Sequence, residues 1–168
     1  MSTEDLPHRA SPRWGRFSQP GGCYHVTKCR YRDAPLSLAD ARVAPILIDS
    51  ILWHRDRGHA HLLAFVVMPD HVHWLFVLGE ERSLDQVLHG FSSVTWRRIL
   101  GVCASHSPTI WEEEYHDHQL RTEERVWATI EYVHGNPVRK GLCERAEDWP
   151  WSTASEQFRS WIEDGYLS

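Results

Sequence analysis

Two apolar runs separated by a Pro-Asp pair constrain the fold more than any other feature of this sequence. They occupy residues 65–68 and 71–77. Short apolar runs on either side of such a pair predict two strands joined by a tight turn. Because side chains alternate between the two faces of a strand, His71 and His73 lie on the same face. Two neighbouring imidazoles on a rigid strand supply half of a metal site.

The spacing of these two histidines is not informative alone, because histidine is abundant in the chain. With 12 histidines among 168 residues, about one His-x-His triplet is expected by chance, and the sequence contains three. The other two lie at residues 59–61 and 116–118. Only the pair at residues 71–73 directly follows a predicted strand turn, and this context selects it.

Hydrophobic periodicity predicts four strands and three helices along the chain. The expected strands span residues 23–30, 61–67, 71–78 and part of 115–121, and the expected helices span residues 45–57, 83–100 and 123–136. Ser83 is the expected cap of the second helix, and Pro137 is expected to end the third. The order of the first six elements predicts an α+β fold of the ferredoxin-like (RRM-like) split βαβ class. In that fold an antiparallel sheet carries helices on one face, and here one further helix follows.

Length and cysteine pattern predict a single reduced domain. A chain of 168 residues can bury a sufficient core without a disulfide or a metal. We expect residues 1–20 to form a flexible basic arm and residues 153–168 a C-terminal tail. The four cysteines show no Cys-x-x-Cys spacing. No apolar run is long enough to span a bilayer, and the N-terminus lacks a signal-peptide core, which favours a cytoplasmic protein without a membrane partner.

Charge is distributed unevenly, which leaves two interpretations of the surface. The formal net charge of −5 argues mildly against a nucleic-acid partner. However, residues 1–33 carry six Lys and Arg against three acidic residues, whereas residues 143–168 carry two against six. One interpretation is that the basic N-terminal part still binds DNA. The alternative is an ordinary enzyme with an acidic surface. The candidate DNA contacts are Arg13, Arg16, Arg97 and Arg98.

The last predicted helix carries a second group of polar side chains. Its expected buried stripe is centred away from Tyr132 and contains Val126, Trp127, Ile130, Val133 and His134. Asn136 lies one helical turn after Tyr132 and Arg125 two turns before it, so the three share one polar face. The alternative is an exposed tyrosine and a helix-terminal asparagine, both of which are common.

Four short motifs occur in order along the chain. They read Met-Pro-Asp-His-Val-His (68–73), Tyr-His-Asp-His-Gln-Leu-Arg (115–121), Tyr-Val-His-Gly-Asn-Pro-Val-Arg-Lys-Gly-Leu (132–142) and Trp-Pro-Trp-Ser (149–152). Together they resemble the REP-associated tyrosine transposases, relatives of the single-tyrosine HUH insertion-sequence transposases. Each motif alone is a weak signal, whereas four in this order, within about residues 22–152, are specific.

The resemblance implies a metal-dependent transposase or endonuclease that cleaves and rejoins single-stranded DNA near REP-like palindromic hairpins. Tyr132 would match the nucleophile, on a catalytic helix, and would form a 5′-phosphotyrosine. His71, His73 and Asn136 would match the ligands of Mg²⁺ or Mn²⁺. His118 matches a recurrent histidine that is either adjacent to the site or buried for structural reasons.

The residues themselves add one expectation to those of the family. A tyrosine hydroxyl ordinarily has a pKa of about 10 and is a poor nucleophile near neutral pH, so the attacked phosphate needs its charge neutralised. Arg125 is our candidate phosphate contact, from its place on the polar helix face.

Two other classes of hydrolase do not fit this sequence. Leu75 follows His73 where a histidine-triad hydrolase needs another histidine, and a metallo-β-lactamase-like run is also absent. A non-catalytic protein of the same fold that binds DNA hairpins is the serious alternative. We expect a monomer rather than a homodimer, associated with the nucleoid through its DNA partner.

Overall fold

The computed structural model describes residues 18–103 and 109–166. Its strands are β1 (Cys23–Cys29), β2 (Ala60–Val67), β3 (His71–Leu78) and β4 (His116–Leu120). Its helices are α1 (Ala44–Asp56), α2 (Leu84–Cys103), α3 (Glu123–Arg139) and α4 (Glu156–Arg159), with 3₁₀ turns η1 (Ala146–Asp148) and η2 (Asp164–Tyr166). Arg13, Arg16 and most of the predicted N-terminal arm lie outside the described residues. Among the described helices, none is both long and apolar enough to cross a membrane.

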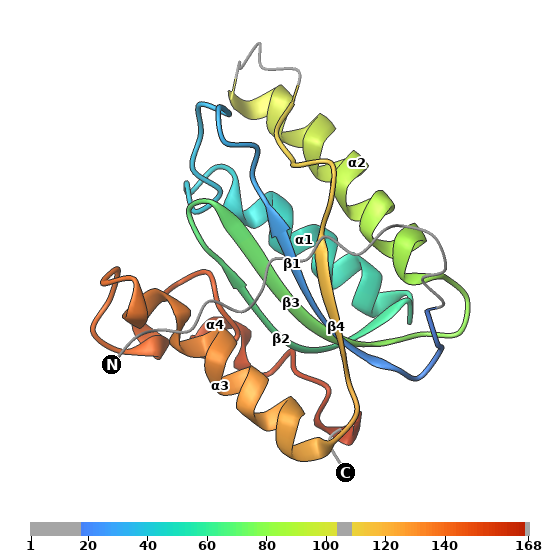
Figure 1. Ribbon diagram of the computed structural model, residues 1–168. Helices are drawn as coiled ribbons and strands as arrows, with labels where there is room; N and C mark the ends of the chain where they lie inside the picture. The colour runs from blue at the N-terminus through green and yellow to red at the C-terminus, as the bar shows by residue number, and fades with distance from the viewer. Residues whose placement is uncertain (1–17, 104–108, 167–168) are drawn as a thin grey trace.

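The four strands form one antiparallel sheet in the order β2-β3-β1-β4. Helices α1 and α2 cover one face of this sheet, and α3 lies across the other (Figure 1). Strands β3 and β1 are central and pair along the whole of β1. The predicted α+β, ferredoxin-like fold class is therefore confirmed, with two helices on one face and the further helix on the opposite face.

Alternation along β3 explains why each face of the sheet packs against different helices. Val72, Trp74 and Phe76 are at most 2% exposed and belong to the larger core beneath α1 and α2. Leu75 and Val77 point to the other face and belong to a smaller core that includes α3 residues. Burying one large apolar side chain contributes about 1.5–3 kcal/mol. Both faces of this strand therefore help to dock helices.

The predicted turn between β2 and β3 is held by one hydrogen bond within the hairpin and by two from outside it. The Met68 amide donates to the carbonyl of His71 across the turn, at 2.8 Å. The turn's own carbonyls accept from distant segments, Pro69 from the Leu38 amide at 2.9 Å and Asp70 from the Arg30 amide at 2.7 Å. The strand that follows consequently begins at a well-defined position.

Helix α2 begins as predicted and ends later than predicted. The hydroxyl of Ser83 accepts from the Gln86 amide at 3.2 Å, and the Gln86 side chain accepts from the Ser83 amide at 2.9 Å. This reciprocal pair is a capping box, which satisfies two free amides at the start of the helix. The helix continues past the expected end at Leu100 to Cys103.

The prediction that Pro137 ends α3 is wrong. The helix includes Pro137 and continues to Arg139. Gly141, with a φ of 68°, supplies the stop, because its amide bonds the Val138 carbonyl at 2.9 Å and the next amide, that of Leu142, bonds the Pro137 carbonyl at 2.9 Å. These two bonds define a Schellman motif, which needs a residue in the left-handed conformation. One extra turn of helix thus places Arg139 on α3.

Residues 151–153, which lead into the predicted C-terminal tail (153–168), lie against the sheet. Ser152 forms a bridge with Val66, on the edge of β2 that β3 leaves free. The Val67 amide donates to the Trp151 carbonyl at 2.8 Å, and the Thr153 amide donates to the Phe65 carbonyl at 3.1 Å. A covered edge cannot pair with another chain, so this segment protects one side of the sheet.

Candidate functional site

His71 and His73 lie side by side on the face of the sheet that carries α3. Their Nε2 atoms are 3.2 Å apart. The Nδ1 atom of His71 lies 2.7 Å from a carboxylate oxygen of Asp70, and the Nδ1 atom of His73 lies 2.9 Å from the hydroxyl of Thr27 on β1. Each imidazole therefore has a polar partner behind it and a nitrogen that faces the other imidazole.

The partner of each Nδ1 atom bears on which nitrogen of that imidazole carries the proton. A carboxylate only accepts hydrogen bonds, so the Nδ1 atom of His71 is the donor to Asp70. If Nδ1 of His73 likewise donates to Thr27, both Nε2 atoms present lone pairs to each other. Two lone pairs 3.2 Å apart repel unless a proton or a cation lies between them. Ligands at right angles around Mg²⁺ lie about 3 Å apart, so the pair fits a shared divalent ion.

Burial keeps His73 in the form that can bind a metal. The imidazole is 5% exposed. Burial, and then the electrostatic effects of His71, His25 and Arg139, together lower its pKa to about 2. A histidine must be neutral to donate a lone pair to a metal ion.

Strand β1 supplies two site residues that sequence reasoning did not identify. Thr27 is directly opposite His73 in the sheet, and His25 lies two positions along the same strand face. The Nε2 atom of His25 is 3.1 Å from Nδ1 of His73. The pKa of His25 is lowered to about 4 by burial and then by His118. Alternation along residues 23–30 placed Thr27 and His25 on one face, but only the strand order places that face beside His73.

Tyr132 reaches the same region from α3. Its ring centroid is 5.6 Å from that of His73 and 6.1 Å from that of His25, with both imidazoles near perpendicular to it. The side chain is 44% exposed, away from the buried residues Val126 and Ile130 of its own helix. The predicted polar helix face thus borders the histidine face of the sheet.

The predicted buried stripe of α3 needs one correction, and Asn136 lies deeper than expected. Trp127, expected in the stripe, is 47% exposed, because the helix packs on the sheet through the narrower line of Val126, Ile130 and Val133. Asn136, one turn beyond Tyr132, is only 4% exposed. Its amide has no side-chain hydrogen bond to any described residue. An amide oxygen with no other hydrogen-bond partner suits a ligand for a hard cation.

Arg139 is a further residue at this site that was not predicted. Its guanidinium carbon lies 4.3 Å from the centroid of the Tyr132 ring, and its Nη2 donates to the Tyr132 carbonyl. The signal was the seven-residue spacing, which puts both residues on one helix face. Arg139 was not predicted to share this face, because Pro137 was expected to end the helix.

The other predicted residues fall in different places. His118 on β4 is paired with His25 in the sheet and shares its face. Arg125 is exposed near the start of α3, two turns from Tyr132. Arg97 and Arg98 are on α2, across the sheet from the histidines, and Arg98 forms an ion pair with Asp49 at 2.9 Å. The structure therefore does not bring either arginine of α2 to this site.

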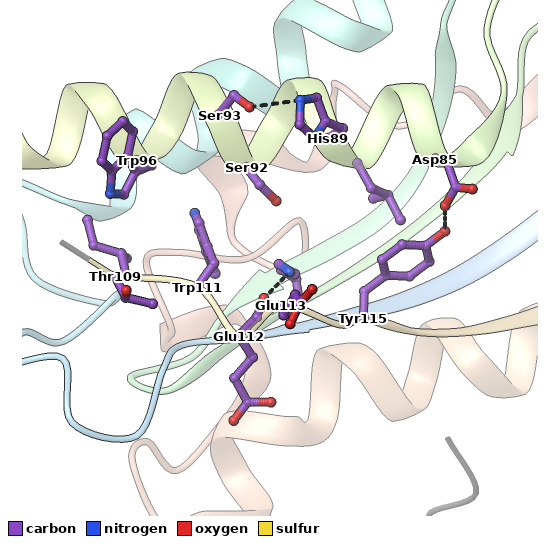
Figure 2. A pocket seen from close by; sticks show the side chains of 13 residues that line it. Asp85, His89, Ser92, Ser93, Trp96, Thr109, Trp111, Glu112, Glu113 and Tyr115 are labelled. Carbon is purple, nitrogen blue, oxygen red and sulfur yellow. Dashed lines mark hydrogen bonds between the residues drawn. The ribbon is translucent and has the colours of Figure 1, made fainter. Parts of the chain in front are cut away.

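A groove of the described chain lies away from the histidines. It has a volume of about 520 Å³ and lies between α2 and the segment that precedes β4 (Figure 2). Its side chains include Trp96, Trp111 and Tyr115, together with Asp85 and other acidic residues. None of the histidines of β1 and β3 lines it. The histidine site is instead on the face of the sheet that α3 only partly covers (Figure 1).

Across residues 18–103 and 109–166, no group of three histidine, cysteine or carboxylate side chains could hold a metal ion. A metal site built on the histidine pair of β3 would therefore need a third donor of another kind. A neutral amide such as that of Asn136 is such a donor, and two imidazoles with one amide leave the full charge of the ion available to an anionic substrate.

The chain is similar in sequence to known transposases. The family model described as "Transposase IS200 like" matches residues 23–136. A REP-associated tyrosine transposase of Escherichia coli is 32% identical over 101 residues, which are 59% of this chain and 56% of that protein. A Haemophilus influenzae protein with a related description is 25% identical over 100 residues, 54% of this chain and 57% of its own. The chain thus spans little more than half the length of these curated relatives.

Among solved structures, that of a REP-associated tyrosine transposase bound to a REP hairpin superposes with a TM-score of 0.68. It is 22% identical in sequence, and the match covers 85% of this chain and 82% of that one. At this identity the likeness supports the fold alone.

Proposed function

The chain belongs to the IS200-like transposase family, and from that premise we propose that it cleaves and rejoins single-stranded DNA beside palindromic hairpins. The observation that carries this proposal is the position of Tyr132, whose ring is 5.6 Å from that of His73 on the face of the sheet that α3 only partly covers (Figure 1). A hydroxyl nucleophile beside two converging imidazole nitrogens matches the requirements of phosphodiester transfer.

In the proposed reaction, the Tyr132 hydroxyl oxygen attacks the phosphorus of a DNA phosphodiester. The bond from phosphorus to the 3′ oxygen breaks, and that oxygen leaves as a 3′-hydroxyl with a proton balanced by the one lost from the tyrosine. The product is a 5′-phosphotyrosine. Attack by a 3′-hydroxyl on this linkage restores the tyrosine and a DNA strand, so no external energy source is needed.

The residues around Tyr132 would hold the tyrosine and the DNA phosphate in place. Asp70 and Thr27 orient the imidazoles of β3, and Asn136 presents an amide from the helix that also carries the nucleophile. When bound by His71, His73 and Asn136, Mg²⁺ or Mn²⁺ would neutralise charge on the attacked phosphate and orient it. Holding reactants in such a geometry replaces an unfavourable bimolecular encounter.

We further propose that the DNA partner is a REP-like hairpin and that the protein acts as a monomer. The hairpin follows from the related structure, which is described as bound to a REP hairpin. A sheet face that is only partly covered can accept the single strand next to a stem without closing around it.

A direct test uses end-labelled hairpin DNA with a single-stranded flank, incubated with protein and Mn²⁺ or Mg²⁺. Wild type should form an adduct that resists denaturant and migrates with the protein. Tyr132→Phe should form none, because it lacks the attacking oxygen, and should bind the hairpin within about threefold of wild type.

Two outcomes would contradict the proposal. Equal adduct formation by Tyr132→Phe would assign the nucleophile elsewhere. Tight hairpin binding by wild type without adduct on any flank tested would favour a non-catalytic hairpin-binding protein.

A further inference from the structure

The Arg139 side chain folds back along α3 instead of extending into solvent. Its Nη2 donates to the carbonyl of Tyr132, and its guanidinium carbon lies 4.3 Å from the centroid of the Tyr132 ring. A cation within about 6 Å of an aromatic face is attracted to it. The ring of Tyr132 is therefore bounded by a guanidinium on its face and by the imidazoles of His25 and His73 near its edge.

Gly135 explains how the guanidinium can occupy this position. A Cβ atom at Gly135 would lie 2.8 Å from Nη1 of Arg139, closer than real Cβ contacts allow. Within the described part of the chain, and apart from the backbone of α3 and the residues adjacent in sequence, only atoms of Arg139 lie within 4 Å of that position. Glycine inside a helix costs about 1 kcal/mol relative to alanine. Here the missing side chain leaves space that Arg139 fills.

Tyr132 has little else to hold it. The side chain is 44% exposed, and its hydroxyl has no hydrogen-bond partner among the described residues. An exposed tyrosine without such a partner can leave the rotamer that points at the histidine face. The stacked guanidinium favours that rotamer, because leaving it would break the contact with the ring.

We propose that Arg139 is a positioning residue that holds the Tyr132 ring over the histidine face, and that Gly135 is required to make room for it. This inference rests on the proposed role of Tyr132 as nucleophile. It adds a role for two residues of the Tyr132–Leu142 motif that the chemistry itself does not use.

The contact can be tested without DNA or metal. In the free protein, ring currents from Tyr132 should displace the Nε–Hε resonance of Arg139 in a proton–nitrogen NMR spectrum. Tyr132→Leu and Gly135→Ala should each return that resonance toward the position of an exposed arginine. An unchanged resonance in Tyr132→Leu would show that the stacking is absent and would overturn the inference whatever the protein does to DNA.

The effect on reaction is measured as the rate of adduct formation at saturating hairpin. Arg139→Ala and Gly135→Ala should each lower this rate at least about tenfold, with hairpin affinity within about threefold of wild type. Arg139→Lys should recover only part of the rate, because an ammonium lacks the planar stacking surface. Lys140→Ala is the matched control, since it removes a neighbouring exposed cation at the same helix end, and it should react like wild type.

Gly135→Ala separates positioning from folding. The substitution improves helix propensity, so its melting temperature should equal or exceed that of wild type while the reaction slows. The double variant Gly135→Ala/Arg139→Ala should be no slower than Arg139→Ala alone, because both changes remove one interaction. Additive losses, or a wild-type rate in Gly135→Ala, would overturn the inference. Failure of wild type itself to form an adduct would instead reject the role of Tyr132.

Discussion

At the scale of single residues, the orientation of His73 depends on a neighbour in another strand. Thr27 on β1 lies 2.9 Å from Nδ1 of His73 and is its direct partner in the sheet. A hydrogen bond at this nitrogen leaves the other nitrogen free for a ligand. Asp70 does the same for His71 from the adjacent position in sequence. The converging pair is thus supported by one local and one distant contact.

Thr27→Val should weaken metal binding by the histidine pair. Valine keeps the shape of threonine but cannot accept the hydrogen bond, and loss of such a partner typically reduces metal affinity about 10- to 100-fold. Mn²⁺ titration by electron paramagnetic resonance measures the effect directly. Thr27→Ser, which retains the hydroxyl, is the control and should bind like wild type. Equal affinity in Thr27→Val would indicate that His25, 3.1 Å away, orients His73 instead.

At the scale of elements, α3 is long enough to carry the whole helical half of the site. Tyr132, Asn136 and Arg139 are separated by four and three residues and lie on one side of the helix. Pro137 lies inside the helix, where it removes one backbone donor, and Gly141 closes the last turn. The stop at Gly141 therefore determines that Arg139 is helical.

Gly141→Ala should destabilise the protein by about 1 kcal/mol, because a non-glycine residue is strained at a φ of 68°. Apart from its chain neighbours, no described residue has an atom within 4 Å of the added Cβ, so the cost comes from the backbone and not from a clash. For a chain of this size the melting temperature should fall by about 2–4 °C. Gly101→Ala, inside α2 with equally open surroundings, is the control and should raise it. Equal shifts of the same sign would contradict this explanation.

At the scale of the whole molecule, buried histidines couple stability to pH. The pKa of His54 is lowered to about 4 by burial, and then by His59 and Arg82. The pKa of His134 is lowered to about 4 by burial and then by Arg159. In the unfolded chain both would bind protons near pH 6.5. The unfolded state therefore binds more protons than the folded state as the pH falls.

The free energy of unfolding should consequently decrease as pH falls from about 6.5 toward 4, and the loss from these groups should level off below that. Urea denaturation at several pH values measures it. His54→Gln should show a shallower decrease, whereas His89→Gln, a substitution at an exposed position of α2, should leave the slope unchanged. If the free energy of unfolding decreases with falling pH as steeply in His54→Gln as in wild type, other groups cause the pH dependence.

Much of this architecture was predictable because the signals are local. The pairing of His71 with His73 follows from alternation within one strand, and the Pro-Asp turn and the Ser83 capping box involve residues close in sequence. Element order then predicted the fold class. The end of α3 was predicted wrongly because proline is a statistical stop signal, whereas the hydrogen bonds at Gly141 decide where the helix ends.

What the sequence determined by itself is therefore the content of each half of the site: two histidines on a strand, and a tyrosine and an asparagine one turn apart on a helix. Only the tertiary structure decided which strand lies beside β3, and hence that Thr27 and His25 support His73. It also decided that α3 docks on the face opposite α1 and α2, with Tyr132 over the histidines. These are non-local contacts, set by how apolar faces are buried against one another, and no short stretch of sequence specifies its partner across the sheet.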